Sequence, residues 1–274
     1  MRNRLIQRLV RQRNSGGVLL TNRAAFSAAT FIGSREGNQD TFRAGSRVPC
    51  SPARKRFARV GVLQWNGTEL FCVCDGVGGA SRGDAAAKGA LMAVDAYLTH
   101  ADESRPLREL ALEAAEAAQR WVCNFYERIG MYGGCTLAML AIRENRYVFL
   151  NIGDSPGFLV SPDADILELS VRHNLAWQHM RMDQPVQNGE DAQLLRYLGM
   201  PGRTATELAD LREGSVHAGY RFMLCSDGIT NAFSPETLEE ALLRGVTAAE
   251  IARAAAKPEG ADNCTLVCLE ILEQ

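Results

Sequence analysis

The sequence predicts an α+β fold in which long helices pack on largely antiparallel β-structure. Helical signals fall in blocks between the strands, and this arrangement is typical of a layered α+β domain. Two apolar segments, CTLAMLAI and YVFLNIG, are separated by only a few residues, which favours an antiparallel hairpin. Seven apolar runs have the length of strands rather than helices: 25–33, 60–65, 69–74, 135–142, 146–152, 220–225 and 264–271.

Four helices are expected between these strands. One covers residues 83–98, and another follows Ser104, where apolar residues recur at three- and four-residue steps from Leu107 to Phe125.

The last two helices carry recognisable capping residues. The third begins at Ser234, which is followed by proline, and ends at Gly245. The fourth begins with Thr247 and Glu250, a capping box, and ends before Pro258.

Length and composition limit the classes of protein to which this chain can belong. The chain has 274 residues, 46% of them hydrophobic, which is enough for one large domain or two small ones. Thirty basic and 32 acidic residues leave a net charge of -2, so bulk charge does not indicate a nucleic-acid partner. No run approaches the roughly 18 apolar residues of a membrane span, and the N-terminus lacks the apolar centre of a signal peptide.

The cysteines show neither a CxxC pair nor zinc-like spacing with histidine. Most lie in apolar runs, so we expect buried, reduced thiols and a cytoplasmic location. The eight are Cys50, Cys72, Cys74, Cys123, Cys135, Cys225, Cys264 and Cys268.

Two segments are rich in arginine. Residues 1–25 contain six arginines and no acid, which leaves two interpretations: a frayed arm or a basic anchor for a surface or partner. Residues 43–59, which include Arg43 and Arg59, are expected to form a basic loop that is either simply solvated or a positive rim for anionic substrates.

Aspartates occur repeatedly at the ends of apolar runs. One such residue is readily explained as a turn or cap residue, but five in one chain suggest that the strand ends converge. Converging carboxylates repel one another, and bound cations are the usual remedy. The five are Asp40, Asp75, Asp154, Asp227 and Asp262.

The donor types select the cation. Aspartate and backbone carbonyl oxygens suit Mg²⁺ or Mn²⁺, whereas zinc would recruit histidine or cysteine. The four histidines show no ligand spacing, so His173 alone is weak evidence of a site. Glycine at position 76 would let its carbonyl reach a cation without a side chain in the way.

Six motifs in order carry a family resemblance: SREGNQD, CDGVGGASRGDAAA, GGCTLAMLAI, NIGDS, LCSDGITN and ADNCTLV. Together they resemble the metal-dependent protein serine/threonine phosphatases of the PPM (type 2C) family, in its compact bacterial form. The resemblance runs from about residue 26 to 272 and implies a four-layer sandwich of two antiparallel β-sheets flanked by antiparallel helix pairs. Residues 26–274 would be a single catalytic domain after the basic arm 1–25, with a variable flap at 172–200.

The resemblance also implies roles for individual residues. Asp75 would bridge two cations, one completed by the Gly76 carbonyl and by Asp40 through a water. Asp227 and Asp262 would hold the other cation. Asp154, together with Asp227, would contribute to a weaker third ion.

The implied activity is hydrolysis of phosphoserine and phosphothreonine in proteins by a metal-activated bridging water, without a phosphoenzyme. Arg35 would grip the substrate phosphate and offset its charge, although it could instead pair with a surface acid. The implied partners are phosphoprotein substrates and an opposing serine/threonine kinase.

Three residues depart from the family pattern. Val77 stands where some relatives carry a histidine proposed as general acid, and Gln39 where many carry glutamate. Pro156 replaces the usual arginine after GDS, which puts the local loop in doubt but not Asp154.

Two other functions compete with an active phosphatase. Pro156 and the divergent flap suggest a pseudophosphatase that binds a phosphoprotein without turnover. The basic segments suggest a two-metal hydrolase of nucleic acid, but they lack interleaved aromatic residues, so no nucleic-acid partner is expected.

Overall fold

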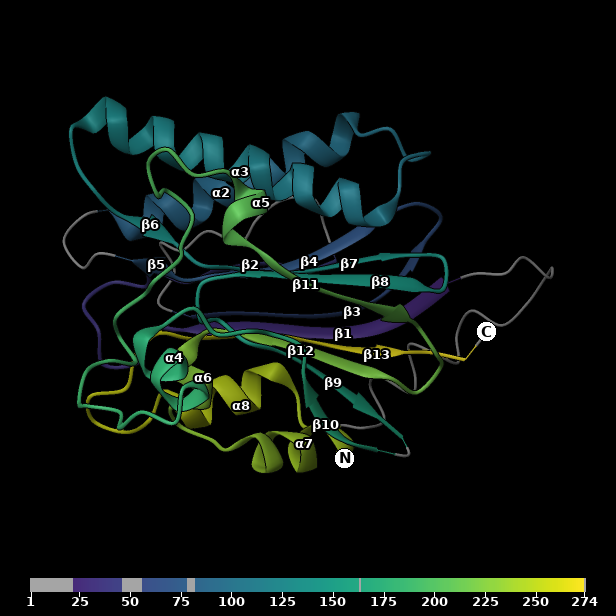
Figure 1. The fold of residues 1–274 in the computed structure, drawn as a ribbon. Helices are drawn as coiled ribbons and strands as arrows, with labels where there is room; N and C mark the ends of the chain where they lie inside the picture. The colour runs from purple at the N-terminus through teal and green to yellow at the C-terminus, as the bar shows by residue number, and fades with distance from the viewer. Residues whose placement is uncertain (1–21, 46–55, 78–81, 163, 274) are drawn as a thin grey trace.

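Two antiparallel sheets stack face to face, with a helix pair on each outer side (Figure 1). This architecture comes from a computed structural model that describes residues 22–45, 56–77, 82–162 and 164–273. The four-layer arrangement of sheets and helices expected from the sequence is confirmed.

The first sheet has six strands, and all of its neighbouring strands are antiparallel. In spatial order they are β10 (Ala164–Glu168), β9 (Gly157–Ser161), β12 (Arg221–Cys225), β13 (Cys264–Ile271), β1 (Asn22–Phe31) and β3 (Arg56–Trp65).

The second sheet has five strands and is also antiparallel. Its β7–β8 pair is the hairpin that the sequence predicted. In spatial order the strands are β11 (Asp210–Ser215), β8 (Arg146–Ile152), β7 (Leu137–Arg143), β4 (Glu69–Cys74) and β2 (Thr41–Arg43). A small separate ladder joins β5 (Gly76–Val77) to β6 (Gly134–Cys135).

Helices α2 (Gly83–His100) and α3 (Leu107–Ile129) cover the five-stranded sheet. Helices α7 (Pro235–Leu243) and α8 (Ala248–Ala255) cover the six-stranded sheet. The predicted caps are present: Ser234 caps α7, and Thr247 with Glu250 forms a capping box on α8. Three short helices are α4 (Leu175–Arg181), α5 (Ala205–Leu208) and α6 (Asp227–Thr230).

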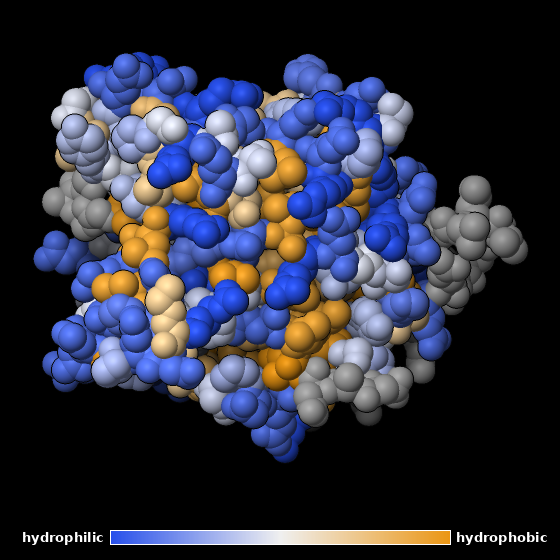
Figure 2. All heavy atoms as spheres, viewed as in Figure 1, coloured by the Kyte–Doolittle hydropathy of each residue, from blue (hydrophilic) through white to orange (hydrophobic). Residues whose placement is uncertain are grey.

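The core is divided among the layers. Large side chains such as Phe71, Phe149 and Phe222 fill the space between the sheets. Alanines dominate where α2 and α3 meet, because a close helix approach leaves room only for small side chains. Polar side chains predominate over the outer side of this helix pair, at the top of the view in Figure 2.

Two predicted segment boundaries are wrong. Strand β1 begins at Asn22, so residues 22–25 of the expected arm belong to a sheet; residues 1–21 lie outside the described part. The expected basic loop 43–59 is also shorter than predicted, because β3 begins at Arg56 and β2 extends through Arg43. Its residues 46–55 lie outside the described part.

Arg43 is not a surface residue at all; its side chain is 1% exposed. Its Nε donates to Asp95 on α2 at 2.6 Å, and its Nη1 donates to Glu69 on β4 at 2.8 Å and to the carbonyl of Leu70. Alternation along β2 places this side chain under α2, and a charge there is tolerated because two carboxylates surround it.

Within the described residues, no helix is long and apolar enough to cross a membrane. The seven cysteines that are described all have free thiols, and all but Cys123 are buried; Cys50 lies outside the described part.

We expect Arg43→Met to lower the free energy of unfolding by about 3–5 kcal/mol, because it leaves the buried Asp95 without its cation. Urea denaturation followed by circular dichroism measures this loss.

Arg244→Met is the matched control for this experiment. Its ion pair with Glu240 joins side chains that are 72% and 60% exposed, so the loss should stay below about 1 kcal/mol. Equal losses in the two variants would contradict a structural role for the buried ion pair.

Candidate active site

Strand ends from both sheets deliver five aspartates to one edge of the sandwich. Asp75 directly follows β4. Asp154 lies two residues beyond β8, and Asp227 two residues beyond β12. Asp40 and Asp262 lie just before β2 and β13. Because neighbouring strands are antiparallel, the ends of some strands and the starts of others meet at the same edge.

Most of the residues predicted for the site line a single open cavity of about 440 Å³. They are Arg35, Asp75, Gly76, Asp154, Asp227 and Asp262. Asp40 does not line the cavity: it is fully buried, and its carboxylate accepts a hydrogen bond of 2.7 Å from the Ser226 hydroxyl. Sequence reasoning therefore found a group of residues that the fold does bring together.

The carboxylates destabilise one another's charged forms. Burial raises the pKa of Asp40 to about 7, and the charges of Asp227 and Asp262 act in the same direction. Burial, reinforced by Asp227, raises the pKa of Asp154 to about 7. The pKa of Asp75 is raised by burial and by its four carboxylate neighbours. Positive charge brought into the cavity would relieve this repulsion.

Two observations fit a divalent cation. One carboxylate oxygen of Asp40 and one of Asp227 are buried without a hydrogen-bond partner in the described structure. The available donors are all oxygen atoms, the set that Mg²⁺ and Mn²⁺ prefer. However, no three acidic, histidine or cysteine side chains of the described residues are already arranged around one point as ligands. Cation binding would therefore require side-chain adjustment.

Both carboxylate oxygens of Asp262 already accept hydrogen bonds from other groups of the protein. One accepts from the guanidinium of Arg35 at 2.6 Å, and the other from the backbone N–H of Asn263 at 2.7 Å. Arg35 therefore pairs with an acid, but this acid is Asp262 of the cavity and not the separate surface acid of the alternative interpretation. The guanidinium lies at the cavity and is 59% exposed, so it also remains open to solvent.

Gly76 has a packing role that the sequence did not reveal. A Cβ on this residue would lie 2.4 Å from a backbone carbon of Gly83, the first residue of α2. Only glycine lets the start of β5 and the start of α2 approach this closely. The same absence of a side chain leaves the Gly76 carbonyl unobstructed.

Sequence reasoning missed residues that hold the aspartates in place. The Thr136 hydroxyl accepts from the Asp75 N–H at 2.9 Å and is 2.6 Å from the Ser155 hydroxyl. The Asn263 side chain accepts from Gln39 N–H and donates to the carbonyls of residues 32 and 37, which fixes the loop that carries Arg35. Thr136 lies within the motif GGCTLAMLAI and Asn263 within ADNCTLV. Their places in these motifs were the signal that could have identified them as site residues.

The segment 172–200 contributes to the cavity wall through Ala192 and Leu194. Its first residues contact the Asp154 loop, where the Asn174 side chain donates to Asp154 at 3.2 Å. Val77 and Gln39, two of the departures from the family pattern, also line the cavity. With proline at position 156, Asp154 still lines the cavity. The carbonyl of Pro156 accepts a hydrogen bond from the Cys225 N–H.

Comparison with known proteins finds a family model and relatives that are all described as phosphatases. A family model described as Protein phosphatase 2C matches residues 58–261. The serine/threonine protein phosphatase PstP of Mycobacterium tuberculosis is 25% identical over 218 residues, 76% of this chain; the chain spans only 41% of that relative's length. A serine/threonine phosphatase stp of Listeria innocua is 27% identical over 219 residues, 73% of this chain and 84% of the relative.

Solved structures share the fold. The catalytic domain of PstP, crystallised in complex with two manganese ions, superposes with a TM-score of 0.70 at 24% identity, covering 92% of this chain and 100% of that one. The serine/threonine phosphatase Stp1 of Staphylococcus aureus superposes with a TM-score of 0.73 at 18% identity, covering 96% and 99% of the two chains.

In a chelating buffer, we expect the free energy of unfolding to fall as pH rises from about 5.5 to about 8. The folded-state pKa values of Asp40 and Asp154 are raised from 3.8 to about 7. The stability that comes with their protonated forms is therefore complete below pH 3.8 and is lost as pH rises through about 7. Urea denaturation in EDTA at several pH values measures the slope.

Saturating Mn²⁺ is the control, because cation binding requires deprotonated carboxylates and should flatten or reverse the slope. Stability that rises with pH in EDTA over this window would contradict the inferred repulsion.

Proposed function

The chain belongs to the protein phosphatase 2C family, and from this premise we propose that it hydrolyses phosphoserine and phosphothreonine in proteins with the help of divalent cations. The observation that carries the proposal is the convergence of four aspartates and Arg35 on one cavity, with Asp40 directly behind it. The four carboxylates of this cavity would by themselves repel a phosphate. The cavity becomes suited to a phosphorylated substrate once cations are bound.

The residues would share the cations as follows. Besides burial, the charges of Asp40, Asp227, Asp154 and Asp262 all raise the pKa of Asp75, so this carboxylate lies near each of the others, which suits a shared ligand. Gly76 and Asp40, the latter through a water, would complete one ion, and Asp227 and Asp262 the other. Asp154 and Asp227 would share the weaker third. When bound, divalent cations would lower the pKa of a water and neutralise charge on a phosphoryl group.

Arg35 would orient the substrate. Its guanidinium offers a planar pair of donors that matches two phosphate oxygens. Only its Nη2 donates to Asp262, and the guanidinium carries five N–H donors in all, so donors remain for a phosphate. Its position at the cavity and its exposed fraction of 59% leave it accessible to a phosphorylated side chain.

The substrates we propose are phosphoproteins, and the opposing enzyme would be a serine/threonine kinase. The half-open cavity suits a phosphorylated side chain entering from a protein surface better than a fully enclosed small molecule. The free cysteines support a reducing compartment such as the cytoplasm. The alternative, a phosphoprotein-binding module without turnover, rested on Pro156 and the divergent flap; the five aspartates at and directly behind the cavity favour turnover instead.

We expect metal-dependent release of phosphate from a phosphothreonine peptide, saturating with Mn²⁺ or Mg²⁺ and abolished by EDTA. Asp227→Asn should lower kcat/KM by roughly 100-fold, because it removes a ligand charge. Arg35→Ala should raise KM by roughly 10- to 100-fold, since a charge-assisted hydrogen bond to phosphate contributes about 1.5–3 kcal/mol.

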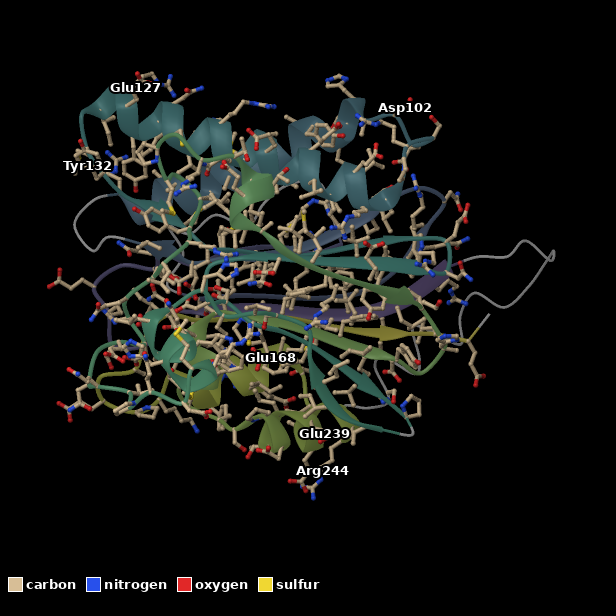
Figure 3. All side chains as sticks on the ribbon, in the orientation of Figure 1. Asp102, Glu127, Tyr132, Glu168, Glu239 and Arg244 are labelled. Atoms are coloured by element: carbon tan, nitrogen blue, oxygen red, sulfur yellow. The ribbon has the colours of Figure 1, made fainter. Side chains whose placement is uncertain are left out.

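Glu239→Gln, on the outer side of α7 (Figure 3), is the matched control and should leave turnover unchanged. No release of phosphate from this peptide or from a small aryl phosphate, under conditions where Mn²⁺ binds, would contradict the proposal.

A further inference from the structure

Of the four histidines, all within the described residues, only His173 is buried, with an exposed fraction of 4%. The backbone N–H of Gly153 donates to its Nδ1 at 3.1 Å, and its Nε2 lies 2.7 Å from a carboxylate oxygen of Asp210. The ring therefore connects the residue before Asp154 to the first residue of β11.

These two contacts define one tautomer. A backbone N–H can only donate, so Nδ1 has to keep its lone pair, and the ring hydrogen has to lie on Nε2, where it donates to Asp210. Burial, the largest effect on this ring, lowers the pKa of His173 and so favours the neutral form. The same arrangement of carboxylate and histidine orients ligands in metal sites.

The segment that carries His173 runs alongside the Asp154 loop and is bonded to it residue by residue. The Asn151 side chain bonds both the N–H and the C=O of Val171. The His173 N–H donates to the Gly153 carbonyl at 3.1 Å. Asn174 then donates to the Asp154 carboxylate at 3.2 Å.

Gly153 has little room to move away from this clamp. Its φ is +102°, a conformation open mainly to glycine, and a Cβ there would lie 2.6 Å from the Thr136 side chain. The backbone that presents Asp154 is thus held between Thr136 on one side and the His173 ring on the other.

The far side of the ring is connected to the segment that contributes Ala192 and Leu194 to the cavity wall. Asp210, which accepts from His173, also accepts from Arg196 at 3.0 Å. The backbone carbonyl of His173 accepts from Leu195 N–H at 2.8 Å, next to Leu194, which lines the cavity.

We propose that His173 is a positioning residue of the active site: through Nδ1 it fixes the backbone that presents Asp154 to a divalent cation, and through Asp210 it ties that backbone to the 192–196 wall. The inference rests on the proposed metal-dependent function. It goes beyond that function, because it assigns a role to a side chain that touches neither substrate nor cation.

Two amide variants separate the halves of this role. In His173→Asn, the amide oxygen occupies the place of Nδ1 and can still accept from Gly153, but the side chain is too short to reach Asp210. In His173→Gln, the amide nitrogen can reach Asp210, but no acceptor remains for Gly153. Asp154→Asn serves as the reference for loss of the Asp154 charge, and His217→Asn, at an exposed histidine, as the matched control.

The readouts are Mn²⁺ binding by electron paramagnetic resonance titration, kcat and KM on an aryl phosphate, and thermal stability. We expect His173→Gln to resemble Asp154→Asn. In both variants, the Mn²⁺ that binds most weakly should lose roughly 10- to 100-fold in affinity, or kcat should fall by an equal factor. His173→Asn should stay within about threefold of the wild type, and ring ¹⁵N shifts of the wild type should be those of the Nε2–H tautomer.

The proposal is overturned if His173→Gln matches the wild type in Mn²⁺ binding and kcat per folded molecule, even when its thermal stability falls. It is also overturned if His173→Asn is as impaired as His173→Gln, or if Nδ1 carries the proton. If the wild type binds Mn²⁺ without turnover, that result would instead count against the proposed function. The role of His173 would still be decided by comparing Mn²⁺ binding between the wild type and the two His173 variants.

Discussion

Electrostatic repulsion among five closely spaced carboxylates is the constraint on which this structure depends. Asp75 is surrounded by four other aspartates, and burial removes the solvent that would otherwise screen them. A flexible chain would relax such a cluster by moving the charges apart. Here each aspartate lies at or next to the end of a strand, so the two sheets keep the charges together at the edge of the sandwich, where a bound cation would relieve their repulsion.

Arg43 shows the other way in which the same fold accommodates buried charge. Its guanidinium meets Asp95 and Glu69 within the protein, so that charge cluster is complete without an outside ion. Among the residues that the structure describes, no arginine, lysine or histidine forms an ion pair with the other four aspartates of the cluster, Asp40, Asp75, Asp154 and Asp227. Arg35 reaches only Asp262 and stays at the edge of the cavity. The contrast separates a structural ion pair from a site that needs a ligand.

Precise placement of the aspartates depends on neutral residues that carry no charge into the cavity. Thr136 holds the Asp75 backbone, Asn263 holds the loop before Asp40, and His173 holds the backbone beside Asp154. Each uses hydrogen bonds that are buried or partly buried, where the low local dielectric strengthens them. Such residues let carboxylates remain close without adding to their repulsion, and they couple the cavity to the rigid sheets behind it.

The sequence by itself determined the α+β class, the main strands, the caps of α7 and α8 and the five aspartates, because periodicity, capping and charge at strand ends are local properties. Only the tertiary structure decided the rest. Arg43 reads as part of a basic loop until α2 covers it, and Arg35 gains Asp262 as a partner from 227 residues away. The spacing of the histidines in the sequence did not indicate a role for His173. Its partners Gly153 and Asp210 belong to other segments, which meet only when the sheet forms. Contacts between distant segments follow from packing, which a local pattern does not encode.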